Sequence, residues 1–325
     1  MKVADSWLHL RASLADPPGK ARNGRGFRSD TYVAAMLQFE QLTIAAGSVA
    51  PFARPLLLYY AAGNAARALI AAFSPQPQTG RHGLKQPKAP LPEDVMAFEV
   101  EPHGTRNLLA DLCALTGCEV PGEPILLSDL FLSLPDLSDK PQSLDGHKAI
   151  FLEEVPDPTQ FQALRDPLMR IRLETEELPA QDQLYEVFPT LRGWHEEDEN
   201  QNSITSRRQL ARVFRSEQPI EYRDRKAALD AVAQTYRYSG DRWLIPTISG
   251  LSTPLSPLAT WYVLLFGFSI LARYEPAAWM RALDVRERHA VAIESSLEEA
   301  ISALPELVWK QVTLAEVSAR SRGQS

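Results

Sequence analysis

Cysteine is scarce in this sequence of 325 residues. Cys113 and Cys118 cannot supply a disulfide framework for a chain of this length, which favours a reducing compartment. The N-terminal stretch also lacks the basic region and apolar run that are typical of a signal peptide. We therefore expect a cytoplasmic protein whose cysteines are core thiols.

An excess of positive charge is also missing. The 34 lysines and arginines are outnumbered by 41 acidic residues, and the formal net charge is −7. Broad adhesion to nucleic acid depends on many basic side chains that neutralise phosphates, so the composition gives such a partner no support. A local basic segment, with Lys20, Arg22, Arg25 and Arg28, is expected to be a solvated loop.

The sequence lacks the short motifs of common enzyme classes. The glycines of residues 19–26 have neither the spacing nor the preceding strand of a phosphate-binding loop. The run from His195 begins like a zinc-protease helix, but Glu199 stands where the second histidine belongs, so we expect an acidic loop. Gly267-Phe268-Ser269 lacks the second glycine of a nucleophile turn. The sequence therefore predicts no metal site and no cofactor.

Long apolar helical segments occur near both ends of the chain. Residues 31–73 predict two helices, and in the second, residues 56–70, nearly every face is apolar or small. Residues 255–271 form another apolar run. A membrane span needs about 20 apolar residues, and this run carries Ser256 and Pro257 near its start and ends at Arg273 and Glu275. Both segments are expected to be core helices, with no membrane partner.

The middle of the chain has mixed character. We expect a mainly α protein in which residues 1–85 and 250–325 form one helical bundle. Residues 90–249 are expected to form a mixed α/β inserted or flanking subdomain. Strands are predicted at residues 95–100, 149–152, 168–173 and 184–191, and helices at 105–115, 287–304 and 305–317.

Polar residues within the two apolar segments are the candidate site. Asn64 and Arg67 lie three residues apart on one helix face, and Arg273 closes the second apolar run. Each arginine can extend to the surface or pair with an acid such as Glu40 or Glu275.

The alternative is that Arg67 and Arg273 converge on one pocket with Asn64 and His82. Such a pocket would hold an anion, either a phosphate group or a carboxylate of a partner protein, because planar guanidinium groups can donate to two oxygens at once. Under this hypothesis the protein binds an anionic small molecule or an anionic segment of another protein.

Both ends of the chain resemble a known family. The segment Arg54–Tyr60, with Asn64, Arg67 and His82-Gly83-Leu84 after it, resembles the bacterial YaaC-like family, as do Leu255–Phe266 and the corner Leu271–Pro276. That resemblance implies a protein of unassigned activity. The paired helices are also distantly similar to the HEPN superfamily, whose members include RNases and toxin or phage-defence proteins.

The chain departs from the HEPN nuclease signature, in which a histidine follows an arginine by four to six residues. No histidine of this sequence has an arginine at that upstream spacing; the six are His9, His82, His103, His147, His195 and His289. We therefore expect a binding or regulatory component rather than an enzyme. A metal-independent RNase and a structural scaffold are the alternatives.

Overall fold

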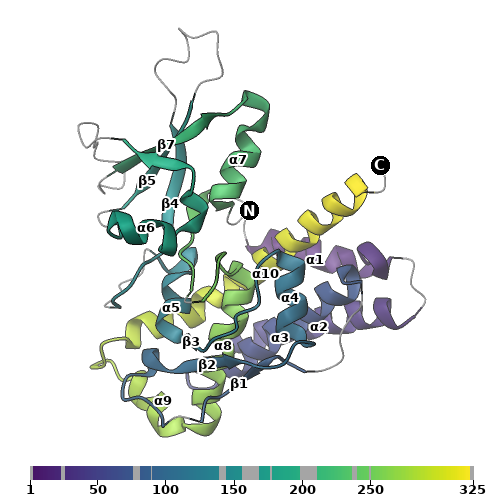
Figure 1. Ribbon diagram of the computed structural model, residues 1–325. Helices are drawn as coiled ribbons and strands as arrows, with labels where there is room; N and C mark the ends of the chain where they lie inside the picture. Colours follow the sequence, from purple (N-terminus) through teal and green to yellow (C-terminus); the bar gives the residue numbers. More distant parts are fainter. Residues whose placement is uncertain are drawn as a thin grey trace.

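The protein is mainly α-helical, as expected from the sequence. The computed structural model describes residues 3–22, 26–75, 81–88, 90–138, 144–155, 168–175, 178–197, 211–235, 240–248 and 250–322. Ten α-helices lie in this described part. Figure 1 shows most of them gathered into one body, with a β-sheet and two short helices on one side of it.

The helical body contains segments from both ends of the chain. Its central helix, α3 (Arg54–Phe73), packs against α2 (Phe27–Ser48) and α8 (Pro257–Tyr274). The long C-terminal helix α10 (Ala290–Arg322) also contacts α2, α3 and α8. The other helices of this body are α1 (Val3–Ala15), α4 (Leu108–Thr116), α5 (Leu127–Leu132) and α9 (Pro276–Ala282).

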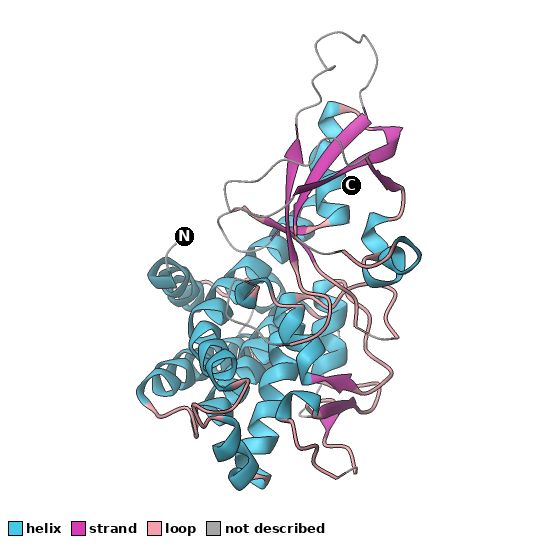
Figure 2. Cartoon of the chain, turned by 90° about the vertical axis from the view of Figure 1, so that its left-hand side faces the viewer, coloured by secondary structure: helices cyan, strands magenta, loops and turns pink. Residues whose placement is uncertain are grey.

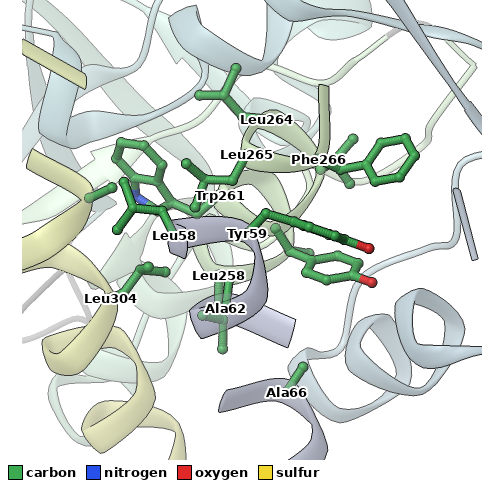
Figure 3. Close-up of a cluster of buried hydrophobic side chains, with 14 of the residues drawn as sticks. Leu58, Tyr59, Ala62, Ala66, Leu258, Trp261, Leu264, Leu265, Phe266 and Leu304 are labelled. Carbon is green, nitrogen blue, oxygen red and sulfur yellow. The ribbon is translucent and has the colours of Figure 1, made fainter. Parts of the chain in front are cut away.

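Close packing of α3 on α8 forms the centre of the core (Figure 3). Ala62 and Ala66 keep the α3 surface low, and Trp261 of α8 fills the space beside Leu58. The rings of Tyr59 and Phe266 meet edge to face with centroids 5.4 Å apart. The two apolar segments predicted to be core helices therefore contact each other directly.

Both of these helices are long and apolar enough to cross a membrane. In their most apolar windows, however, 72% of the α3 residues and 83% of the α8 residues are buried inside the molecule. That burial is typical of core helices in a soluble protein, because a membrane-spanning helix needs an apolar surface for lipid.

A small antiparallel sheet lies beside the helical body. It consists of β1 (Leu84–Lys85), β2 (Glu99–Pro102) and β3 (Ile125–Leu126). Side chains between residues 84 and 137, such as Phe98 and Phe131, belong to the same core as α3 and α8. This part of the expected middle segment therefore packs with the helices.

The larger sheet is antiparallel, in the order β6-β7-β5-β4-β9-β8. It has its own core, separate from that of the helices, and Figure 2 shows it at one end of the molecule. The strands predicted at residues 149–152 and 168–173 are confirmed as β4 and β5. The elements are β4 (Ile150–Val155), β5 (Leu168–Glu174), β6 (Trp194–Glu196), β7 (Ala211–Pro219), β8 (Gln234–Thr235), β9 (Arg242–Leu244), α6 (Gln181–Val187) and α7 (Arg225–Val232).

Two expectations for the middle segment were wrong. Residues 184–191 form the end of α6 and a short 3₁₀ turn, because Leu184, Phe188 and Leu191 are buried at helical spacing. The expected acidic loop at His195 is partly the edge strand β6. Its acids are neutralised by arginines of neighbouring strands, for example Glu196 by Arg212 at 3.0 Å. Residues 198 and 199 lie outside the described residues.

Three helix or strand boundaries also differ from expectation. The strand expected at residue 95 begins at Glu99, after a 3₁₀ turn in which Asp94 accepts from the Met96 N–H at 2.9 Å. The helix expected from residue 105 begins at Leu108. The two expected C-terminal helices are one, α10, with Pro305 inside it.

Two arginines of the basic segment near the N-terminus bond to other elements of the protein. Arg28 donates to the carbonyls of Ala71 at 3.0 Å and Ser74 at 2.9 Å, at the C-terminal end of α3. A cation there is stabilised by the partial negative charge of the helix end. Arg22 pairs with Glu316 at 2.6 Å, whereas Arg25 lies outside the described residues. Arg28 therefore connects α2 to the end of α3, and Arg22 connects the N-terminal segment to α10, so these arginines do more than keep the surface soluble.

Candidate functional site

A small cavity lies between α3, α8 and the chain that leads into β1. Its volume is about 140 Å³. Its wall combines four aromatic rings with two arginines and a histidine. The lining residues are Tyr59, Tyr60, Gly63, Arg67, His82, Leu108, Tyr262, Phe266 and Arg273.

Helical spacing places these side chains on facing surfaces. Gly63 and Arg67 of α3 are four residues apart, so they lie on one face of the helix. On α8, Tyr262, Phe266 and Arg273 are separated by four and then seven residues, which also places them on one face. The cavity is thus a direct product of how α3 packs on α8.

Hydrogen bonds fix His82 at the edge of this cavity. The Tyr262 hydroxyl donates to the His82 carbonyl oxygen at 3.0 Å. The Leu84 N–H donates to His82 Nδ1 at 3.1 Å, so the neutral imidazole carries its proton on Nε2. The ring lies 5.3 Å from that of Phe266, centroid to centroid. His82 is exposed on its other side.

Asn107 holds the loop in which His82 lies. Its side chain donates to the Gly104 carbonyl at 2.7 Å and accepts from the Ala110 N–H at 2.8 Å, which caps α4. The His103 N–H donates to the Gly83 carbonyl at 2.8 Å. The turn next to His82, the turn after β2 and the start of α4 are therefore one hydrogen-bonded unit.

Neither cavity arginine has a carboxylate partner among the described residues. Arg67 donates to the Asn64 side-chain oxygen at 3.3 Å. Arg273 donates through Nε to the Ser269 carbonyl at 3.1 Å, and its guanidinium carbon lies 5.0 Å from the Tyr274 ring centroid. Glu40, one of the acids considered as a partner, instead bonds to Arg11.

Charge and burial together set the protonation states in the cavity. Burial lowers the pKa of His82, and the charges of Arg273, His103 and Arg67 lower it further. Burial raises the pKa of both Tyr59 and Tyr262. At neutral pH the described lining of the cavity therefore has two cations, a neutral imidazole and protonated phenols, and it includes no negative group.

The structure brings together three of the four residues that the sequence analysis proposed for a pocket. Arg67, His82 and Arg273 line the cavity. Asn64 does not line it: its side chain is 6% exposed, donates to the Tyr60 carbonyl at 3.0 Å and accepts from Arg67. Asn64 therefore orients Arg67.

Sequence reasoning left open that each arginine extends to the surface instead of holding its charge inside the core. Arg67 is exposed and Arg273 is half-buried, so water solvates part of each charge. It overlooked the aromatic residues Tyr59, Tyr262 and Phe266. Each of these rings lies one or two helical turns from an arginine or from another of the rings on the same helix. That spacing could have identified them from the sequence.

No group of three metal-ligating side chains occurs in the described part of the chain. Cys113 and Cys118 are free thiols, at the end of α4 and just beyond it. To a ligand the cavity itself offers hydrogen-bond donors, positive charge and aromatic surface.

Comparison with known proteins gives a family. No curated protein and no solved structure matches the chain. The family model described as YaaC-like Protein matches residues 8–312, which is nearly the whole sequence and includes every residue of the cavity. The resemblance noted at both ends therefore extends through the middle, and the chain belongs to the YaaC-like family.

Proposed function

We propose that this protein is a cytoplasmic binding or regulatory component that holds an oxyanion in the cavity between Arg67 and Arg273. One observation carries the proposal: two guanidinium groups without a carboxylate partner in the described structure line the same small cavity. Repulsion between like charges makes this arrangement unfavourable unless water or a bound anion offsets it. An anion would contact both groups at once.

The size and donors of the cavity favour a phosphate or sulfate group. A volume of about 140 Å³ is several times the roughly 30 Å³ that one water molecule occupies in the liquid. Arg273 donates to Ser269 through Nε, and its two terminal nitrogens bond to no described residue, so they are donors for a ligand. A guanidinium with this geometry suits two oxygens of one tetrahedral anion.

Replacing Arg273 with lysine is expected to weaken sulfate binding by about tenfold or more, although the charge is kept. Lysine loses the planar pair of donors, and a tenfold loss corresponds to about 1.4 kcal/mol. Isothermal titration calorimetry of the purified proteins with sodium sulfate measures this. Arg223→Lys is the matched control, because Arg223 is exposed and pairs with Glu221 in the sheet region. Equal affinity of wild type and Arg273→Lys, or no binding to wild type, would contradict the proposal.

Sulfate binding should also raise the pKa of His82. The free cavity lowers that pKa through burial and then through Arg273, His103 and Arg67. A bound anion offsets the cationic contribution and stabilises the imidazolium, so sulfate affinity should rise as the pH falls through the His82 pKa. Sulfate is the suitable probe because it does not titrate near neutral pH. NMR titration of the imidazole signals with and without sulfate tests this, and the other histidines are internal controls. A His82 pKa unchanged by saturating sulfate would contradict the site.

A metal-independent RNase is the alternative, and one observation favours it. Arg67 and His82 are far apart in sequence but line one cavity, where His82 is neutral at pH 7 and can accept a proton through Nε2 only after rearranging its tautomer. Incubation of the purified protein with mixed RNA discriminates between the two functions. Cleavage by wild type that is lost in both His82→Ala and Arg67→Ala would overturn the binding proposal. It would instead support an RNase, and with it a toxin or phage-defence role.

A further inference from the structure

A second hollow adjoins the cavity on the other side of α3. This open groove has a volume of about 510 Å³. Residues Leu37, Gln38, Gln41 and Leu42 of α2 form one wall, and Tyr60, Asn64 and Arg67 of α3 form the other. Tyr60 and Arg67 line both the groove and the cavity.

The groove suits an uncharged and largely apolar group. Leu37 is 43% exposed and Tyr60 is 44% exposed, so both present apolar surface to solvent. Among the described residues, Arg67 is the one charged side chain that lines the groove, and it also lines the cavity. Gln38 and Gln41 supply neutral amides that can hydrogen-bond to polar atoms at the edge of a ligand.

The part of α3 that separates the groove from the cavity carries mostly small side chains. Tyr60 and Arg67 are seven residues apart, which is about 10 Å along a helix. Every side chain between them is small or buried: the residues are Ala61, Ala62, Gly63, Asn64, Ala65 and Ala66. A ligand can therefore lie across α3 between Tyr60 and Arg67 and occupy both hollows.

The two hollows also complement each other in size and charge. Small-molecule sites usually have volumes of about 300–1,000 Å³. The cavity, at about 140 Å³, is too small for a whole organic ligand but is positively charged, whereas the groove is large enough but carries little charge. One ligand with an anionic end and an apolar body uses both.

We infer, resting on the proposed anion site, that the ligand is a phosphate monoester of a flat apolar alcohol. Its phosphate lies in the cavity on Arg273 and Arg67, and its organic part lies in the groove against the Tyr60 ring. Stacking on an exposed tyrosine favours a planar group over a branched one. Arg67, at the junction, contacts the phosphate from the groove side.

Calorimetric titration with two probes tests this inference. The probes are inorganic phosphate and 1-naphthyl phosphate, which share the anionic group and differ in the apolar body. Wild type is expected to bind 1-naphthyl phosphate at least tenfold more tightly than inorganic phosphate. Leu37→Glu places a carboxylate in the groove and should remove this advantage, with inorganic phosphate affinity unchanged.

Ile44→Glu is the matched control. Ile44 lies on the same helix, is 52% exposed and does not line the groove. Its variant should bind both probes like wild type. Equal affinity for the two probes in wild type, or an unchanged preference in Leu37→Glu, would overturn the groove inference while the anion site stands. Absence of binding to either probe would overturn the anion site itself.

Discussion

Replacing Gly83 with alanine is expected to lower the free energy of unfolding by about 2–4 kcal/mol. Gly83 has a φ of +86°, and a Cβ there would lie 2.1 Å from the Asn107 side-chain oxygen. The backbone conformation alone costs a non-glycine residue roughly 1 kcal/mol or more. The clash also displaces Asn107, whose capping of α4 is worth about 1 kcal/mol. The same change should weaken sulfate binding, since His82 precedes Gly83 directly.

Chemical denaturation followed by circular dichroism measures the loss. Gly104→Ala separates the two causes, because Gly104 has a similar φ of +80° but its Cβ would lie 3.8 Å from the Asn107 nitrogen, an ordinary contact. This control should lose only about 1 kcal/mol, from the backbone conformation. If both variants are equally stable, the clash with Asn107 does not occur and the proposed unit around His82 is wrong.

The helical framework could be predicted from the sequence because its signals are local. The apolar runs at residues 56–70 and 255–271 each lack a polar face, so burial of both was required, and α3 and α8 do pack together. Pro305 is also a local signal, but the helix boundary that it predicted was wrong. It lies within α10 because Leu304, Leu307 and Val308 around it are buried in the core and hold the helix in place.

The cavity could be predicted only in part, because long-range contacts determine it. Arg67 and Arg273 stood out as charges in apolar segments, but the position of His82 depends on a hydrogen bond from Tyr262, 180 residues away in sequence. The role of Asn64 was also hidden. Its spacing placed it on the same helix face as Arg67, yet whether it lines the cavity or the groove depends on how α2 and α8 pack on α3. Local periodicity identifies faces of helices and does not say what covers them.

The packing around α3 and α8 predicts opposite outcomes for alanine at a glycine of each helix, Gly63 and Gly267. Alanine is favoured over glycine within a helix by about 1 kcal/mol. A Cβ at Gly63 would lie 3.9 Å from Tyr262 and 4.0 Å from Leu108, which are ordinary contacts. Gly63→Ala is therefore expected to stabilise the protein by about 0.5–1 kcal/mol, while it narrows the cavity and weakens sulfate binding.

Gly267→Ala should instead destabilise the protein by about 1–3 kcal/mol. A Cβ at Gly267 would lie 2.5 Å from the side chain of Leu127 and 3.1 Å from that of Val100. Both neighbours are fully buried, so neither can move without disturbing the core that joins α8 to α5 and the small sheet. Urea denaturation of the two variants beside wild type measures the difference. A Gly267→Ala protein as stable as Gly63→Ala would mean that α8 is not packed against Leu127 and Val100 as closely as the structure shows.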